Sequence, residues 1–154
     1  MNTEIDTTTL SRCERSLYIA LRMKEHFFVS SEAVPVLAQF AEAFDYQLIQ
    51  VKLESLDDIK GRLVIDYERK SFDYVLDWAQ PLSENPDVTY IVLFLIDENT
   101  DSSLIAKLKS YLDAHILSWG GKKCTNFFAG LIHNGSADII PDTIKRLCYK
   151  IEWQ

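Results

Sequence analysis

The sequence predicts one α/β domain with a mixed sheet, and three observations carry this prediction. Residues 89–97 (TYIVLFLID) and 124–133 (CTNFFAGLIH) are apolar runs, typical of strands buried on both faces. Segments with helical periodicity alternate with these strands, which favours parallel pairing and right-handed crossovers. A length of 154 residues suits a single domain with a well-buried core. The expected order is ααββαβαβα, with helices on both faces of the sheet.

The first third of the chain is predicted to be helical. Residues 1–10 form a polar leader, and residues 11–154 form the domain. Ser11 and the acidic Glu14 three residues later make a capping box, which predicts that a helix begins here. Two serines interrupt the pattern before a second helix that ends at about Phe44. Two helices are therefore expected before any strand.

The next segments predict an antiparallel hairpin. Apolar and polar residues alternate over Tyr46–Glu54 and again over Arg62–Glu68, and the linker SLDDIKG is short and polar. This hairpin is expected to join the parallel core and to make the sheet mixed. Helical spacing then predicts a helix over Phe72–Leu82.

The remaining elements alternate. The run that follows Val88 predicts a central strand, and a helix capped by Asp101 or Ser102 is expected to continue to Gly120. The second apolar run predicts another strand, and Pro141 opens a last helix that reaches Ile151.

Charge and cysteine content restrict the partner and the compartment. The net charge of −7 is concentrated in residues 54–101, where 12 acidic side chains face four basic ones. Such a segment attracts a basic protein or metal ions and repels nucleic-acid phosphates. The three distant cysteines suggest a reduced, cytoplasmic protein. The apolar runs are too short to span a bilayer, so no membrane contact is expected.

One constellation points to catalysis. Asp45 stands at the head of the first expected strand, and Glu68 and Lys70 stand at the end of the second, before a helix and an apolar strand. Over roughly residues 32–96 this arrangement resembles the core of the PD-(D/E)xK nuclease family. The resemblance implies that Asp45 and Glu68 ligate Mg²⁺ and that Lys70 assists the attacking water.

The same charges have a structural interpretation. Asp66, Glu68 and Lys70 can pair with Lys52 and Glu54 across an exposed ladder of strands. Asp97, Glu98 and Asp101 follow the central strand, where acidic residues commonly form turns and helix caps. Glycine-rich phosphate-binding motifs are missing from the sequence.

The sequence therefore favours a non-catalytic protein-binding domain without a cofactor. Its most concrete form is an immunity or antitoxin-type protein that neutralises a basic nuclease toxin, and a Mg²⁺-dependent nuclease or a non-catalytic subunit of a larger assembly are the alternatives. Aromatic and acidic residues are the expected contacts. They are Glu54, Asp57, Asp58, Asp66, Glu68, Tyr74 and Trp78.

Overall fold

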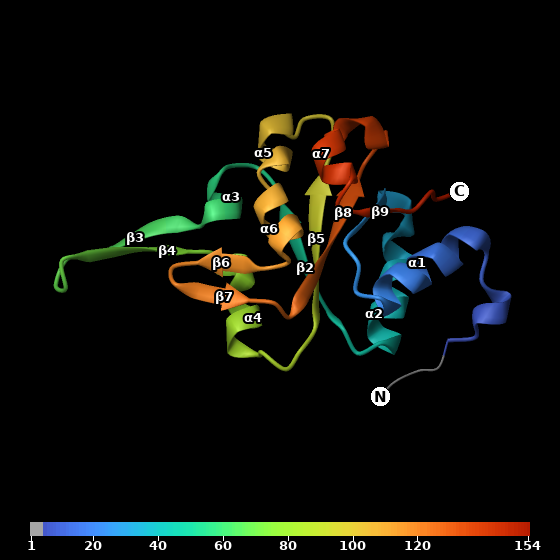
Figure 1. The fold of residues 1–154 in the computed structure, drawn as a ribbon, viewed down its shortest axis with the longest axis horizontal. Helices are drawn as coiled ribbons and strands as arrows, with labels where there is room; N and C mark the ends of the chain where they lie inside the picture. The colour runs from blue at the N-terminus through green and yellow to red at the C-terminus, as the bar shows by residue number, and fades with distance from the viewer. Residues whose placement is uncertain (1–4) are drawn as a thin grey trace.

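A five-stranded parallel sheet forms the centre of the protein (Figure 1). The structure is a computed structural model that describes residues 5–154, so the first four residues of the expected leader lie outside the described part. The strand order is β2-β5-β8-β1-β9. The strands are β1 (Phe27–Ser30), β2 (Gln47–Lys52), β5 (Tyr90–Ile96), β8 (Phe127–His133) and β9 (Tyr149–Lys150).

The two apolar runs form the inner strands, as predicted. β5 pairs in parallel with β2 on one side and with β8 on the other, so that Val92 lies between Ile49 and Ala129. All seven residues of β8 are buried. Because both faces of these strands are covered, an uninterrupted apolar sequence is what their positions require.

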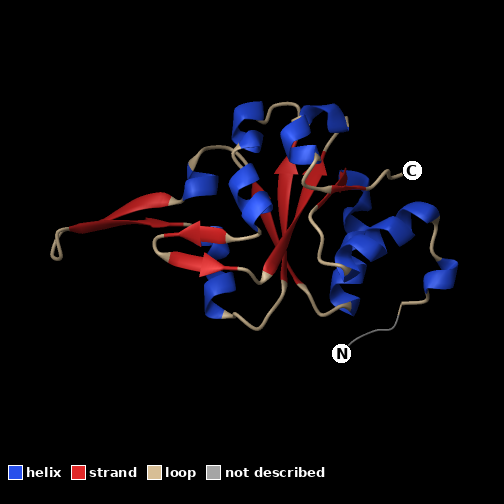
Figure 2. Cartoon of the chain, in the orientation of Figure 1, coloured by secondary structure: helices blue, strands red, loops and turns tan. Residues whose placement is uncertain are grey.

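Helices cover both faces of the sheet, as predicted, and Figure 2 shows the two layers on either side of the strands. One face is covered by α1 (Arg12–Arg22) and α2 (Val34–Ala43). The other face is covered by α4 (Gln80–Glu84), α5 (Ser102–Ala106), α6 (Lys109–Ala114) and α7 (Asp142–Lys145). Within residues 5–154, no helix combines the length and the apolar character needed to cross a membrane.

The predicted start of α1 is confirmed. The backbone N–H of Glu14 donates to Ser11 Oγ at 3.3 Å, and the backbone N–H of Ser11 donates to Glu14 Oε1 at 3.0 Å. This reciprocal pair satisfies two amide groups that the first turn of a helix leaves free. Just before it, a short 3₁₀ turn spans Thr7–Thr9 within the expected leader.

Two small antiparallel hairpins stand apart from the central sheet, and here the predicted pairing is wrong. β3 (Arg62–Asp66) pairs with β4 (Ser71–Val75), and β6 (Leu117–Trp119) pairs with β7 (Lys122–Cys124). β2 pairs in parallel with β5 instead of with β3, and the short helix α3 (Asp57–Lys60) separates β2 from β3. The central sheet is therefore wholly parallel rather than mixed.

Other departures concern short elements. β1 lies between α1 and α2, where only helices were expected, and β4 replaces the first part of the helix predicted over Phe72–Leu82. The helix predicted from Asp101 to Gly120 is divided into α5, α6 and β6. His115, in a left-handed conformation with φ of +54°, ends α6 before β6 begins. α7 spans only four residues before β9 begins. The predicted order ααββαβαβα is wrong in these respects.

Candidate binding surface

The residues that resemble a nuclease centre are not brought together. Asp45 lies in the turn between α2 and β2, where its backbone has φ of +62° and its N–H donates to Glu42 O at 3.1 Å. Glu68 and Lys70 lie in the turn between β3 and β4, at the far end of a hairpin that projects from the body (Figure 1). Within residues 5–154, no cluster of three or more His, Cys, Asp or Glu side chains is arranged to hold a metal ion.

Several acidic residues of the expected partner face stabilise local turns. Asp58 Oδ2 accepts the backbone N–H groups of Glu54 and Ser55 at 2.8 and 2.9 Å. Asp66 Oδ1 accepts the backbone N–H groups of Glu68 and Arg69 in the hairpin turn at 3.1 and 3.2 Å. Such bonds are the usual role of aspartate in turns. These two carboxylates therefore contribute to folding as well as to surface charge.

The two aromatic residues of that expected face have different environments. Trp78 is half-buried, donates its indole N–H to Asp58 O at 2.7 Å, and packs edge-on against Phe94 with ring centroids 5.6 Å apart. It is thus a core residue. Tyr74 is 46% exposed and lies on β4. Of these two aromatic side chains, Tyr74 is the more exposed.

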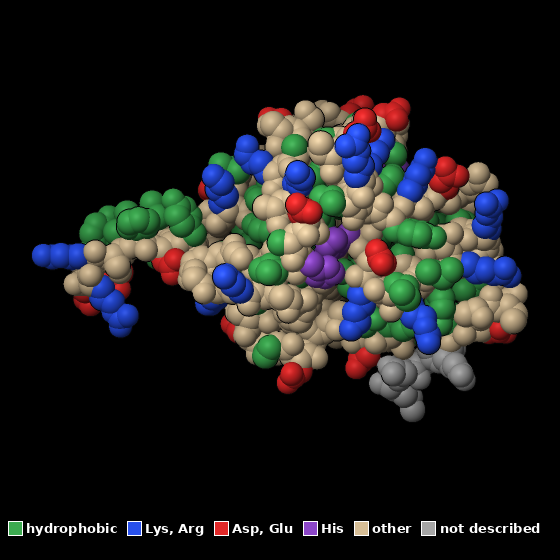
Figure 3. Space-filling view, viewed as in Figure 1, with side chains coloured by type: hydrophobic (Ala, Val, Ile, Leu, Met, Phe, Trp, Pro, Cys, Tyr) green, Lys and Arg blue, Asp and Glu red, His purple; other side chains and the backbone are tan. Residues whose placement is uncertain are grey.

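The projecting hairpin carries a continuous apolar face. Leu63 lies opposite Tyr74 and Ile65 lies opposite Phe72, so the four side chains share one side of the ribbon. Between 46% and 69% of each of these side chains is exposed. We call these four residues the hairpin patch. Figure 3 shows hydrophobic side chains along the hairpin, with basic side chains at its tip.

The opposite side of the hairpin is more polar. It carries Val64 opposite Asp73 and Asp66 opposite Ser71. Since an isolated two-stranded hairpin is marginally stable in water, contacts at its base are needed to hold its position.

Close backbone contacts fix the base of the hairpin. A Cβ on Gly61, which has φ of +92°, would lie 2.8 Å from the carbonyl of Val75. A Cβ on Gly120, in the turn between β6 and β7, would lie 2.4 Å from Tyr74 O. Only glycine allows such approaches. The two hairpins therefore meet at β4, where the longer one leaves the body.

An ion pair adds to this base. Arg62 donates from Nε to Asp77 Oδ2 at 2.7 Å and from Nη2 to Asp77 Oδ1 at 3.1 Å. The guanidinium hydrogen bonds lower the pKa of the Asp77 carboxyl. The pair connects the first residue of β3 to the segment that follows β4.

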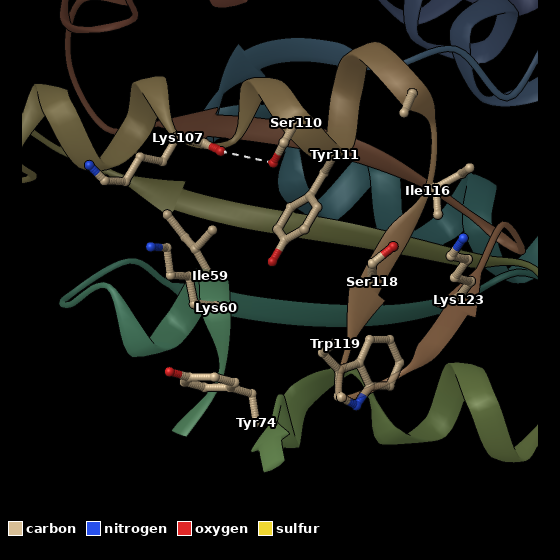
Figure 4. Close-up of a pocket in the computed structure, with 12 residues that line it drawn as sticks. Ile59, Lys60, Tyr74, Lys107, Ser110, Tyr111, Ile116, Ser118, Trp119 and Lys123 are labelled. Atoms are coloured by element: carbon tan, nitrogen blue, oxygen red, sulfur yellow. Dashed lines mark hydrogen bonds between the residues drawn. The ribbon is translucent and has the colours of Figure 1, made fainter. Parts of the chain in front are cut away.

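A groove opens beside the base of the hairpin (Figure 4). Its volume is about 820 Å³. Residues of α3, β4, α6 and the β6–β7 hairpin contribute to its walls, and its charged residues are all lysines. They are Lys60, Lys107 and Lys123. We call this feature the lysine groove.

The carboxyl ends of the strands form another concave site. After β1 the chain turns toward the sheet face that α2 covers. After the neighbouring strand β8 it turns toward the opposite face, which α7 covers, so the two loops separate at the ends of these strands. Ligands of parallel sheets commonly bind at such a point. The cavity here is about 350 Å³ and is lined in part by Ser30, Glu32, His133 and Glu152. Its lining also includes Lys150, whose Nζ lies 3.2 Å from Glu152 Oε1, so the cavity does not offer the excess of positive charge that a phosphate requires.

The acidic residues after β5 have structural roles. Asp97 Oδ1 accepts the N–H of Asn99 at 2.8 Å, and Asp101 Oδ1 accepts the N–H of Ser103 at 2.8 Å as the cap of α5. These bonds match the turn and cap roles that the sequence suggests for the two aspartates.

A histidine pair, which the sequence did not single out, lies near the start of β1 and β8. The rings of His26 and His115 have centroids 4.3 Å apart, and His26 Nδ1 accepts the backbone N–H of Ala129 at 2.9 Å. Burial and the nearby His115 lower the pKa of His26 to about 4. His26 is therefore neutral near pH 7.

Comparison with known proteins identifies a fold but no family. No protein-family model and no curated protein sequence matches the chain. A crystal structure of a "putative ATPase" from Cytophaga hutchinsonii is similar with a TM-score of 0.57 and 14% identity, over 92% of this chain and 44% of that chain. Saccharomyces cerevisiae RIF2 is similar with a TM-score of 0.50 and 13% identity, over 96% of this chain and 56% of that chain. This chain thus spans about half the length of each, and the likeness concerns the fold alone.

Proposed function

We propose that this domain acts without catalysis, by binding another protein through the hairpin patch. The observation that carries the proposal is the exposure of four large apolar side chains on one side of a projecting hairpin. Such a patch is costly in water and commonly marks an interaction site. Tyr74 and Phe72, whose rings meet edge-on with centroids 6.5 Å apart, supply the aromatic surface that anchors interfaces.

The charge distribution supports a basic partner. Residues 54–101 carry 12 acidic and four basic side chains. Within the hairpin, residues 62–75, three acidic and three basic side chains balance, so the acidic excess lies in the parts of this segment that flank the hairpin. Carboxylates around an apolar patch accelerate the encounter with a basic protein. The most concrete form of the proposal is an immunity or antitoxin-type protein that neutralises a basic nuclease toxin. The proposal places the domain in the cytoplasm, where its three free cysteines would stay reduced.

Catalysis receives less support. The nuclease hypothesis needs Asp45, Glu68 and Lys70 in one site, whereas they occupy two separate turns. ATP hydrolysis, suggested by one neighbour in fold, needs a phosphate cradle. The turn after β1, Ser31–Ala33, contains no glycine and leads directly into α2.

The test compares the two sides of the hairpin. The variant Ile65→Thr with Phe72→Thr makes the hairpin patch polar while keeping residues compatible with a strand. Val64→Thr makes the same type of change on the opposite side and is the control. Each protein is crosslinked in cells of its source, and binding of the captured partner is then measured with purified proteins.

We expect the double variant to weaken binding at least tenfold and the Val64→Thr control to change it less than twofold. Circular dichroism should give the same melting temperature for all three proteins, because these side chains are exposed. Partner binding that persists unchanged in the double variant would contradict the proposal.

A further inference from the structure

The lysine groove has the size and shape of a small-molecule site. Its volume of about 820 Å³ lies within the roughly 300–1,000 Å³ that is common for ligand pockets. It is separate from the cavity at the carboxyl ends of the strands, and its lining includes none of the acidic residues discussed above. What the groove accepts can be inferred from its lining.

The floor of the groove is aromatic. Tyr111 and Trp119 are 7% and 4% exposed, and Tyr74 closes one wall. Burial raises the pKa of Tyr111 to about 12, so its hydroxyl stays protonated and can donate a hydrogen bond. An aromatic floor beside an aromatic wall suits a flat ring, which can pack edge-on or offset against these side chains.

The charge at the groove has one sign. Figure 4 shows Lys60 and Lys107 to one side of Tyr111 and Lys123 to the other. The three side chains come from three different segments, yet all of them line the same space. The groove lining contains neither Asp nor Glu, and none of the three lysines forms an ion pair within the described residues, although Asp101 lies near enough to Lys107 to attract it. Positive charge beside an aromatic floor is complementary to an anion that carries a ring.

We propose that the lysine groove binds a small organic anion, consisting of a planar ring that bears a carboxylate, sulfonate or phosphate group. The ring packs against Tyr74, Tyr111 and Trp119, and the acidic group meets the lysines. A bare inorganic anion would gain little, because lysines this exposed are well hydrated. A neutral ring would gain nothing from the three positive charges. The groove shares Tyr74 with the hairpin patch but none of the patch's other three residues, and the proposal does not depend on protein binding.

The probe is 8-anilinonaphthalene-1-sulfonate, which joins aromatic rings to a sulfonate. N-phenyl-1-naphthylamine has the same rings without the charge. The test variant is Lys107→Met with Lys123→Met, which removes two lysines of the groove and keeps their apolar stems. The matched control is Lys109→Met with Lys122→Met, which changes the net charge equally at neighbouring positions outside the lining.

In fluorescence titrations we expect the test variant to weaken binding of the sulfonate about five- to tenfold, and the matched control to change it less than twofold. The uncharged dye should bind both variants equally. Bound sulfonate should also shift the indole N–H resonance of Trp119 but not that of Trp153, with Trp119→Phe used for assignment. The proposal would be overturned if both lysine variants lost the same affinity for the sulfonate, or if the Trp119 resonance did not shift.

Two further measurements separate the remaining explanations. The hairpin variant Ile65→Thr with Phe72→Thr should bind the sulfonate as the unaltered protein does. If it instead abolishes the signal, the dye sits on the hairpin patch and the groove proposal fails, while protein binding stays testable. Adenosine monophosphate and 4-hydroxybenzoate then compete with the dye. The stronger competitor identifies phosphate or carboxylate as the preferred group, and failure of both at millimolar concentration would reject this class of ligand.

Discussion

Gly120 lies against the backbone of Tyr74 so closely that a Cβ on the glycine would meet Tyr74 O at 2.4 Å. The turn between β6 and β7 thereby supports β4 at the point where the hairpin leaves the body. Tyr74 belongs to the hairpin patch and also lines the lysine groove. One backbone contact thus sets the position of both proposed binding surfaces.

This contact predicts a large difference between two adjacent glycines. Gly120 and Gly121 both have positive φ, +50° and +78°, but a Cβ on Gly121 would meet nothing within 4 Å. We expect Gly121→Ala to lower the free energy of unfolding by about 1 kcal/mol, which is the cost of a left-handed alanine. Gly120→Ala should cost about 2–3 kcal/mol, because the clash adds to that strain. Urea denaturation measures both, and equal losses would show that the contact is unimportant.

Asn126 connects the loop before β5 to the start of β8. Its side-chain Nδ2 donates to the carbonyl oxygens of Leu82, Asn85 and Val88 at 3.2, 3.1 and 2.9 Å. We expect Asn126→Ala to lower the free energy of unfolding by about 1–3 kcal/mol, since three carbonyls lose their donor. Asn126→Asp should cost more, because a carboxylate repels the carbonyls. Thermal denaturation at pH 7 should rank the variants in this order, and a stable aspartate variant would contradict it.

The buried His26 predicts acid sensitivity. Its pKa is about 4 in the folded protein and about 6.5 in the unfolded chain, so only the unfolded chain binds the proton between these values. The contribution of neutral His26 to the free energy of unfolding is complete above pH 6.5. It falls by about 3 kcal/mol as the pH is lowered to 4.

The variant His26→Asn isolates this effect. An amide oxygen can still accept the N–H of Ala129, but it does not titrate. In urea denaturation from pH 7 to pH 4, the variant should lose about 3 kcal/mol less than the unaltered protein. Parallel losses in the two proteins would assign the acid sensitivity to other groups, such as the carboxylates.

Variants of Asp57 and Asp58 can distinguish an effect of charge on association from an effect on folding. Asp57 is exposed, whereas Asp58 accepts two backbone N–H groups. We expect Asp57→Lys to slow association with the proposed basic partner several-fold at low salt, with little change in melting temperature. Asp58→Lys should also destabilise the fold by about 1 kcal/mol, because it removes the acceptor. Stopped-flow association rates and melting curves test this prediction. An association rate that does not depend on ionic strength would show that the interface lies away from these acidic residues.

The elements that sequence analysis found correctly are those whose burial determines their composition. β5 and β8 are apolar on both faces, and the capping box marks the start of α1 without ambiguity. β1 was not predicted from the sequence. Its four residues, FFVS, lie between two helices, and Phe28 continues the helical spacing of apolar residues in α1. A strand this short depends on β8 and β9 for its conformation, and a local pattern does not contain these distant partners.

Pairing and site geometry were harder to predict for the same reason. Alternation in β2 indicates one half-buried face, but an edge strand of a parallel sheet and a strand of a hairpin share that pattern. Phe72 and Tyr74 alternate with polar residues in β4, as in a strand. Trp78 follows Tyr74 by four residues, which is helical spacing, and this spacing led to the prediction of a helix. The lysine groove joins residues as distant as Lys60 and Lys123, which periodicity does not relate.

The position of β1 also determines when the protein can fold during synthesis. Phe27 pairs with Gly130, about a hundred residues later, and with Tyr149 beyond that. A ribosome must therefore make most of the domain before β1 meets either neighbouring strand, and until then the backbone groups of β1 have no strand partner. Contacts so distant in sequence slow folding and leave nascent chains prone to aggregation.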